Sequence, residues 1–191
     1  MISGIIFDFF GVISSEVAPI WFGDRFPEEE AGRLKQEYLE PADRGDVSSA
    51  ALFASLSALS GEPAEEIERD FNSLAVIKRD TVELIEKLKE RYRVALLSNA
   101  MGDWLSGILE REDLYRLFDE MIISSEVRLT KPSPEIYKLL ISRLGIAPSE
   151  AVFLDDNPTN AEAARAVGMQ AIVFSSAAEA ARELRKLGVE I

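Results

Sequence analysis

Three acidic residues of the chain stand within or directly after short apolar runs, where a carboxylate is costly to bury. Asp8 interrupts the run GIIFDFFGV, which begins at Gly4, and Asp155 and Asp156 follow the run AVFL, which begins at Ala151. Three carboxylates brought together repel one another unless a divalent cation lies among them. Carboxylate oxygens with retained waters are typical ligands of Mg²⁺, which commonly also holds a substrate phosphate. These acids indicate a magnesium site in which Asp8 could act as a nucleophile toward phosphorus.

Two further positions offer groups that could bind a phosphate. Ser98 and Asn99 follow the apolar run VALL, and the Ser98 hydroxyl could donate to a phosphate oxygen. Lys131 offers a positive charge close to both phosphate and nucleophile, and Lys is a usual point-charge binder of phosphate. The sequence KPSP that begins at Lys131 would fix this residue just before a helix, because each Pro restricts the residue before it.

Each of these features also has a purely structural explanation when it is taken alone. An Asp after a buried strand often forms a turn or caps a helix, and Ser98-Asn99 could be such a cap. Lys131 could be a solvated loop lysine, and the sequence DDNP from Asp155 is typical of a turn. Their order favours function: an acid, then Ser-Asn, then Lys, then an acid pair, each after a strand or just before a helix.

Composition excludes several kinds of chemistry. The chain of 191 residues contains no Cys and no His, which excludes disulfides, Cys/His zinc sites, thiol nucleophiles and His-based triads. Its net charge of −13 argues against nucleic acid or an anionic membrane as the main partner. The chain starts without a basic and apolar leader, and no apolar run approaches the ~20 residues that span a bilayer. We expect a cytoplasmic protein.

Apolar runs that alternate with helical patterns predict a parallel sheet with right-handed crossovers. A first strand is expected in the apolar run that starts at Gly4 and ends at Asp8, and further strands at 94–97, 121–123, 151–154 and 171–174, with helices starting near 80, 103, 134, 158 and 176. Ligands bind beyond the carboxyl ends of such strands, where the polar residues above are found. From about residue 14 to 78 the pattern is helical, with starts near 27, 48 and 63 and a turn at DRGD from Asp43. This module interrupts the sheet after its first strand, so we expect it over the carboxyl ends.

Four segments together resemble the four motifs of the haloacid dehalogenase-like hydrolase superfamily. They are FDFFGV from Phe7, LSN from Leu97, KPSPEIY from Lys131 and FLDDN from Phe153, the last followed by Asn160 and the pair Gly168-Met169. The resemblance spans nearly the whole chain. The helical stretch is similar to the small cap of the branch that includes haloacid dehalogenases, phosphoglucomutase-like phosphatases and the N-terminal domain of soluble epoxide hydrolases.

The resemblance implies an α/β fold: a Rossmann-like, three-layer core of residues 1–13 and 80–191 and an all-helical cap of residues 14–79. It implies that Asp8 is nucleophile and metal ligand, that Phe10 lends its backbone carbonyl to Mg²⁺, and that Asp156 binds the metal more directly than Asp155. Substrate contacts are expected from Ser98, Asn99, Lys131, Phe10, Gly11, Trp21 and Arg25. Aromatic residues such as Trp21 also commonly pack between helices.

One position departs from the pattern of the superfamily's phosphatases. They usually carry a second Asp two residues after the nucleophile, which protonates the leaving group and later activates water. Here that residue is Phe10, which can do neither, and general acid–base help is typically worth ~10²–10⁴-fold. Asp155 or a cap residue could substitute. Otherwise the substrate has a good leaving group, such as an acyl phosphate, or turnover is poor and the fold serves binding.

The resulting hypothesis is a Mg²⁺-dependent hydrolase of a small phosphorylated molecule, as a monomer or homodimer, without nucleic-acid or membrane partners. The alternatives are a halide-releasing hydrolase and a catalytically silent binding protein. Dehalogenases also replace the second Asp, usually with Tyr. They work without Mg²⁺, however, and tend to lose the acid pair that this chain keeps at Asp155 and Asp156.

Overall fold

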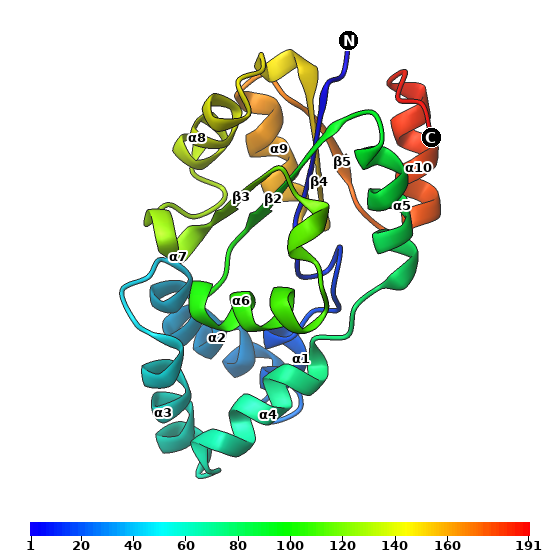
Figure 1. Ribbon diagram of the computed structural model, residues 1–191. Coiled ribbons are helices and arrows are strands. Elements are labelled where there is room, and N and C mark those ends of the chain that lie inside the picture. The colour runs from blue at the N-terminus through cyan, green and yellow to red at the C-terminus, as the bar shows by residue number, and fades with distance from the viewer.

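The computed structural model describes residues 1–191 and contains one five-stranded sheet in the order β3-β2-β1-β4-β5 (Figure 1). All neighbouring strands pair in parallel. The strands are β1 Gly4–Phe7, β2 Arg93–Ser98, β3 Glu120–Ile123, β4 Ala151–Asp155 and β5 Gln170–Val173. Central β1 lies between β2 and β4, so Phe7 is level with Leu96 on one side and Leu154 on the other. The predicted α/β class and the adjacency of the first and fourth motif strands are confirmed.

Helices cover both faces of the sheet and give it three layers (Figure 1). Side chains on one face, such as Ile6 and Phe153, share a buried cluster with α8, while the opposite face shares a larger cluster with α5, α6 and α10. The helices of this core are α5 Arg79–Lys89, α6 Gly102–Arg111, α7 Ser124–Val127, α8 Pro134–Leu144, α9 Pro158–Ala166 and α10 Ala177–Lys186, with 3-10 turns at Tyr115–Leu117 and Pro148–Glu150.

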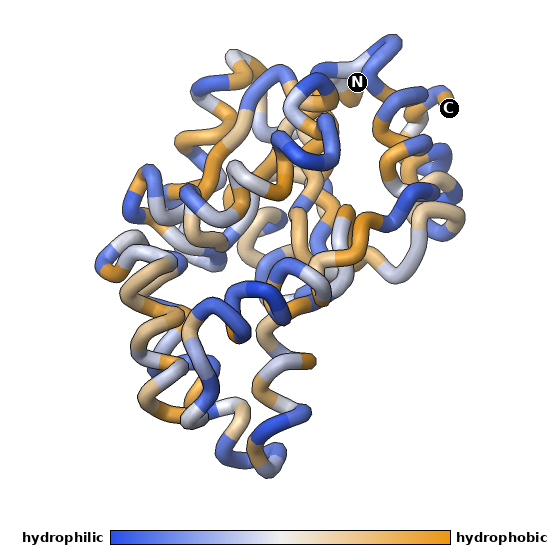
Figure 2. Tube along the Cα trace, turned by 60° about the horizontal axis from the view of Figure 1, so that its bottom comes forward, coloured by the Kyte–Doolittle hydropathy of each residue, from blue (hydrophilic) through white to orange (hydrophobic).

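Four helices between β1 and α5 lie beyond the carboxyl ends of the strands (Figure 1), and we call them the cap. They are α1 Ala18–Gly23, α2 Glu28–Asp43, α3 Ser49–Ser60 and α4 Ala64–Leu74. Hydrophobic and hydrophilic positions are mixed along the cap (Figure 2), and α4 buries the apolar side chains Ile67 and Phe71 as an amphipathic helix does. Phe71 of α4 contacts Trp104 of α6 edge-on, with ring centroids 5.7 Å apart, so the cap and the core share apolar packing. The cap helices span residues 18–74, and helix α5 of the core begins at Arg79.

The chain turns sharply after the first strand, and one helix was not expected from the sequence. Strand β1 ends at Phe7, directly before Asp8, and the carbonyl of Phe9 then accepts from the amides of Ile13 and Ser14, both at 2.8 Å. Gly11 occupies this turn with φ of +79°. Helix α1 was not expected, because its apolar sequence APIWFG shows no amphipathic pattern. No helix combines the length and hydrophobicity needed to cross a membrane.

Candidate active site

The carboxyl ends of β1 and β4 bring three carboxylates together. Asp8 follows β1 directly, and its amide donates to the carbonyl of Leu154 at 2.9 Å, which ties it to the end of β4. Asp155 is the last residue of β4, and Asp156 follows. One carboxylate oxygen from each of the three acids lies within 4.8 Å of the others. The sheet topology therefore assembles the acids that are separated by almost 150 positions in the sequence.

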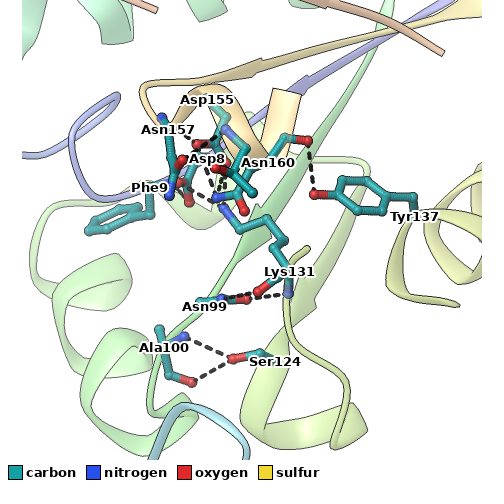
Figure 3. Close-up of polar contacts among 11 residues, drawn as sticks. Asp8, Phe9, Asn99, Ala100, Ser124, Lys131, Tyr137, Asp155, Asn157 and Asn160 are labelled. Carbon is teal, nitrogen blue, oxygen red and sulfur yellow. Dashed lines mark hydrogen bonds and ion pairs between the residues drawn. The ribbon is translucent and has the colours of Figure 1, made fainter. Parts of the chain in front are cut away.

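Lys131 lies beside Asp8 and Asp155 (Figure 3). Its buried ammonium is 2.8 Å from Asp8 Oδ2 and 2.7 Å from Asp155 Oδ2. Burial opposes charge on this lysine, but the two carboxylates raise the pKa of its ammonium, so it stays charged. Burial raises the pKa of the Asp8 carboxyl well above its usual range, although the Lys131 charge lowers it. Burial and the charge of Asp155 raise the pKa of the Asp156 carboxyl. One cation among three acids leaves a deficit of positive charge that a divalent ion would fill.

Asp155 accepts more hydrogen bonds than the other two acids. Its Oδ1 accepts from the Asn157 amide at 2.8 Å, and Asn160 Nδ2 donates to both of its carboxylate oxygens at 3.2 and 3.1 Å. Tyr137 in turn donates its hydroxyl to the carbonyl of Asn160 at 3.0 Å (Figure 3). This network holds Asp155 against Lys131 and leaves Asp8 and Asp156 freer to meet a ligand.

Gly11 makes room for Asp156. A Cβ atom at position 11 would lie 2.1 Å from Asp156 Oδ2, far inside van der Waals contact, and the φ of +79° suits glycine. The Gly11 carbonyl also accepts from the ammonium of Lys78. Gly11, predicted as a phosphate contact, thus also controls how closely Asp156 approaches the turn after β1.

Ser98 and Asn99 have different environments although they are adjacent. The Ser98 hydroxyl is fully buried at the end of β2 and has no hydrogen-bond partner within the protein, so it is free to donate to a ligand oxygen. Asn99 instead exchanges two hydrogen bonds with the backbone of Lys131, at 3.0 and 2.9 Å. The side chain of Asn99, predicted as a phosphate contact, is therefore committed to positioning the lysine loop.

Phe10 lies at the boundary of core and cap. Its ring stacks on Trp104 with centroids 5.4 Å apart and planes at 8°. A cavity of about 50 Å³ opens beside it, lined by Phe10, Glu16, Val17, Ala18, Leu39, Asp43, Phe71, Asn99, Ala100, Met101 and Trp104. Most of these side chains are apolar, so a leaving group placed here would meet an apolar wall.

Trp21 and Arg25, predicted as substrate contacts, lie inside the cap instead. Trp21 is fully buried and packs on Phe22, with ring centroids 4.9 Å apart. The Arg25 guanidinium lies over the Trp21 ring and forms ion pairs with Glu62 at 2.8 Å and Asp70 at 2.5 Å. Neither residue lines the cavity, and packing between helices accounts for both.

Two acids of the connecting segment and cap were not identified from the sequence. Glu16 lies near Asp156, and burial together with the Asp156 charge raises the pKa of the Glu16 carboxyl. Asp43, the last residue of α2, lines the cavity from the cap side. Their sequence context is ordinary, and only the packing of the cap onto the core brings them to the cavity beside Phe10.

Known proteins share both the sequence pattern and the fold. The model of the family described as haloacid dehalogenase-like hydrolase matches residues 2–168. A phosphorylated carbohydrates phosphatase of Thermotoga maritima is 33% identical over 109 residues, or 56% of this chain and 50% of that protein. An (S)-2-haloacid dehalogenase of Burkholderia cepacia is 37% identical over 79 residues, 41% of this chain and 34% of the relative. The chain thus spans half or less of either relative's length.

A solved structure supports the fold assignment. The HAD family enzyme from Bacteroides thetaiotaomicron, crystallised in complex with magnesium and inorganic phosphate, superposes with a TM-score of 0.75 at 24% identity. The likeness covers 92% of this chain and 95% of that chain. At this identity the similarity shows a shared fold.

Proposed function

The chain belongs to the haloacid dehalogenase-like hydrolase family, and we propose that it is a magnesium-dependent phosphohydrolase that acts on a small phosphorylated molecule through Asp8. The observation that carries this proposal is the trio of carboxylates with Lys131 at the carboxyl ends of β1 and β4. A phosphatase among the relatives is consistent with it.

The residues at the site fit a hard divalent cation. Asp8, Asp156 and the backbone carbonyl of Phe10 would hold Mg²⁺. Asp155 would bind the ion less directly and hold Lys131 in place. When bound, the ion would offset the repulsion between the substrate phosphate and the carboxylates. Close approach of Asp156 to the turn at Gly11 and the unpartnered Ser98 hydroxyl both match a site shaped for ion and phosphate.

The chain's own residues then account for phosphoryl transfer. A carboxylate oxygen of Asp8 attacks phosphorus, the bond from phosphorus to the leaving oxygen breaks, and an aspartyl-phosphate forms on Asp8. Lys131 and Ser98 hold the phosphate oxygens during this transfer, for which positioning and charge are the main requirements. Water then attacks phosphorus, which releases phosphate and restores the Asp8 carboxylate.

The acid pair separates this proposal from halide release. A metal-free dehalogenase has no evident use for a third carboxylate beside Asp8 and Asp155, whereas a cation site does. The arginine nearest to the start of the cap, Arg25, is held by Glu62 and Asp70 and does not reach the cavity. Phosphate chemistry is therefore the better match to this geometry.

A substrate panel tests the proposal. Purified protein is incubated with Mg²⁺ and a series of phosphomonoesters and acyl phosphates, and released phosphate is measured against the Asp8→Asn variant. We expect Mg²⁺-dependent release from at least one substrate, lost in Asp8→Asn and after EDTA. Chloride release from 2-haloacids without metal, with no phosphate release from any member of the panel, would contradict the proposal.

A further inference from the structure

The proposed reaction requires a proton donor that residue 10 does not supply. Breaking the bond from phosphorus to an alkyl oxygen leaves an alkoxide unless a proton arrives as the bond breaks. Phe10 offers a hydrocarbon ring at this point, stacked on Trp104. For an alkyl phosphate another group at the site must then supply the proton, and the inference that follows rests on the proposed function.

Most acids near Asp8 are already engaged. Asp155 pairs with Lys131 and accepts three further hydrogen bonds from Asn157 and Asn160. Asp156 belongs to the trio expected to hold the cation, and Glu16 lies close enough to Asp156 for that carboxylate to raise the pKa of the Glu16 carboxyl. Asp43 remains as the cavity acid that has no member of the trio among the charges acting most on it, and its carboxyl is in no ion pair and no hydrogen bond.

The backbone of Asp43 is anchored to the core next to the phosphate-binding strand end. Its carbonyl accepts from the Ser124 hydroxyl, whose oxygen also accepts from the Ala100 amide at 2.9 Å (Figure 3). Ala100 lies two residues beyond Ser98. These bonds fix the end of α2 against the segment that follows β2, and Asp43 lines the same cavity as Phe10 and Asn99.

The surroundings of the Asp43 carboxyl suit an acid that carries a proton near neutral pH. Burial raises its pKa to about 7. The charged groups that act on it come from the cap, the segment before it and the core: Lys35, Lys131, Glu40 and Glu16. A pKa close to the working pH is the condition under which a group both gives and takes a proton efficiently.

We propose that Asp43 is the general acid and base of this enzyme, acting from the cap in place of residue 10. In the first step the Asp43 proton moves to the leaving oxygen as its bond to phosphorus breaks and the bond from Asp8 to phosphorus forms. In the second step water attacks phosphorus, its proton moves to the Asp43 carboxylate, and the bond from phosphorus to Asp8 breaks. The cycle consumes one water and yields the alcohol and phosphate.

The variant Asp43→Asn tests this assignment with substrates of different leaving groups. For alkyl phosphates, which need protonation, we expect kcat/KM to fall by ~10²–10⁴-fold. For acyl or nitrophenyl phosphates the first step survives, but slow attack by water makes the phosphorylated form of Asp8 accumulate, which mass spectrometry of the intact protein detects. Glu37→Gln, an exposed acid on the same helix, should change neither quantity.

A second variant separates a catalytic role from a structural one. Adding Phe10→Asp to Asp43→Asn should restore hydrolysis of alkyl phosphates, because the acid then returns beside the nucleophile. Equal losses for all leaving groups without accumulation of phosphoenzyme, or unchanged activity in Asp43→Asn, would overturn the assignment while leaving the proposed function intact. Absence of both phosphate release and phosphoenzyme in the parent protein would overturn both.

Discussion

A single missing side chain at position 11 decides how the carboxylates are arranged. Gly11 combines a left-handed φ of +79° with a position at which a Cβ would be 2.1 Å from Asp156 Oδ2. The sequence identifies Gly11 as part of a motif, but its physical reason is visible only where Asp156 arrives from β4. The same holds for Asn99, whose hydrogen bonds to Lys131 no local pattern predicts.

Substituting Gly11→Ala should weaken magnesium binding. The added methyl group would push Asp156 away from Asp8, and displaced support for ligands typically costs ~10–100-fold in metal affinity. Isothermal titration with Mg²⁺ measures the effect. Gly188→Ala is the matched control, because it carries a similar φ of +81° with nothing within 4 Å of the added Cβ. Equal Mg²⁺ affinity in Gly11→Ala and the parent protein would contradict this account of Gly11.

Substituting Phe10→Asp should raise hydrolysis of simple alkyl phosphates. The new acid would stand beside the nucleophile at the cavity wall, where its burial cost is modest because the position faces the site. Loss of the ring stacked on Trp104 should lower stability by about 1 kcal/mol, which urea unfolding measures. If Mg²⁺ binds normally but activity does not rise, proton transfer does not limit the parent enzyme.

The ends of the elements, more than their interiors, create the site. Alternating apolar runs correctly predict the parallel sheet, and the rule that ligands bind beyond its carboxyl ends brings Asp8, Ser98 and Asp155 together. The end of α2 was not recognised in this way. The sequence DRGD from Asp43 reads as a turn, which it is, since Gly45 has a φ of +81°. Asp43 lines the cavity because of the way the cap packs on the core, and no local sequence pattern predicts that packing.

Asp43 should make stability depend on pH. An acid whose pKa rises on folding binds its proton more tightly in the folded protein, so its contribution to the free energy of unfolding is fully present at low pH. That contribution is lost as the pH rises from the pKa of the unfolded state, about 3.9, through the pKa of Asp43 in the folded state, about 7. Asp43→Asn removes the charge. Its unfolding free energy at pH 8 should exceed that of the parent protein by on the order of 2 kcal/mol.

Urea unfolding at pH 4, 6 and 8 in the presence of EDTA measures this difference. The gain of Asp43→Asn should shrink toward pH 4, where the parent carboxyl is protonated. Glu37→Gln on the same helix should show no such trend, since its carboxyl is exposed. A difference independent of pH would mean that Asp43 titrates like an ordinary surface acid.

At the scale of the whole molecule, the cap lies over the carboxyl ends of the strands (Figure 1), where Asp8 is buried. Contacts between the two parts include Ser49 with Asp103 at 2.5 Å and Trp104 with Asn72 at 3.2 Å. The cavity of about 50 Å³ beside Phe10 has room for a few waters and not for a phosphorylated metabolite. Under the proposed function we therefore expect the cap to move for substrate entry, as lids commonly do during turnover.

Fixing the cap to the core should stop turnover. The chain contains no Cys, so Ser49→Cys with Asp103→Cys introduces the sole thiols, which a short bismaleimide can join. We expect the joined protein to lose most of its phosphate release, while the same variant treated with a monofunctional maleimide keeps it. Full activity in the joined protein would show that substrates reach Asp8 without cap movement.

The most direct test of the central claim is detection of the phosphoryl group on Asp8. The protein is mixed with an acyl phosphate and Mg²⁺, quenched in acid, digested and examined by mass spectrometry. The account predicts one added phosphoryl group on the peptide that contains Asp8, dependent on Mg²⁺, absent in Asp8→Asn and more abundant in Asp43→Asn. No phosphorylation of that peptide in any of these proteins, with Mg²⁺ shown to bind, would contradict nucleophilic catalysis by Asp8.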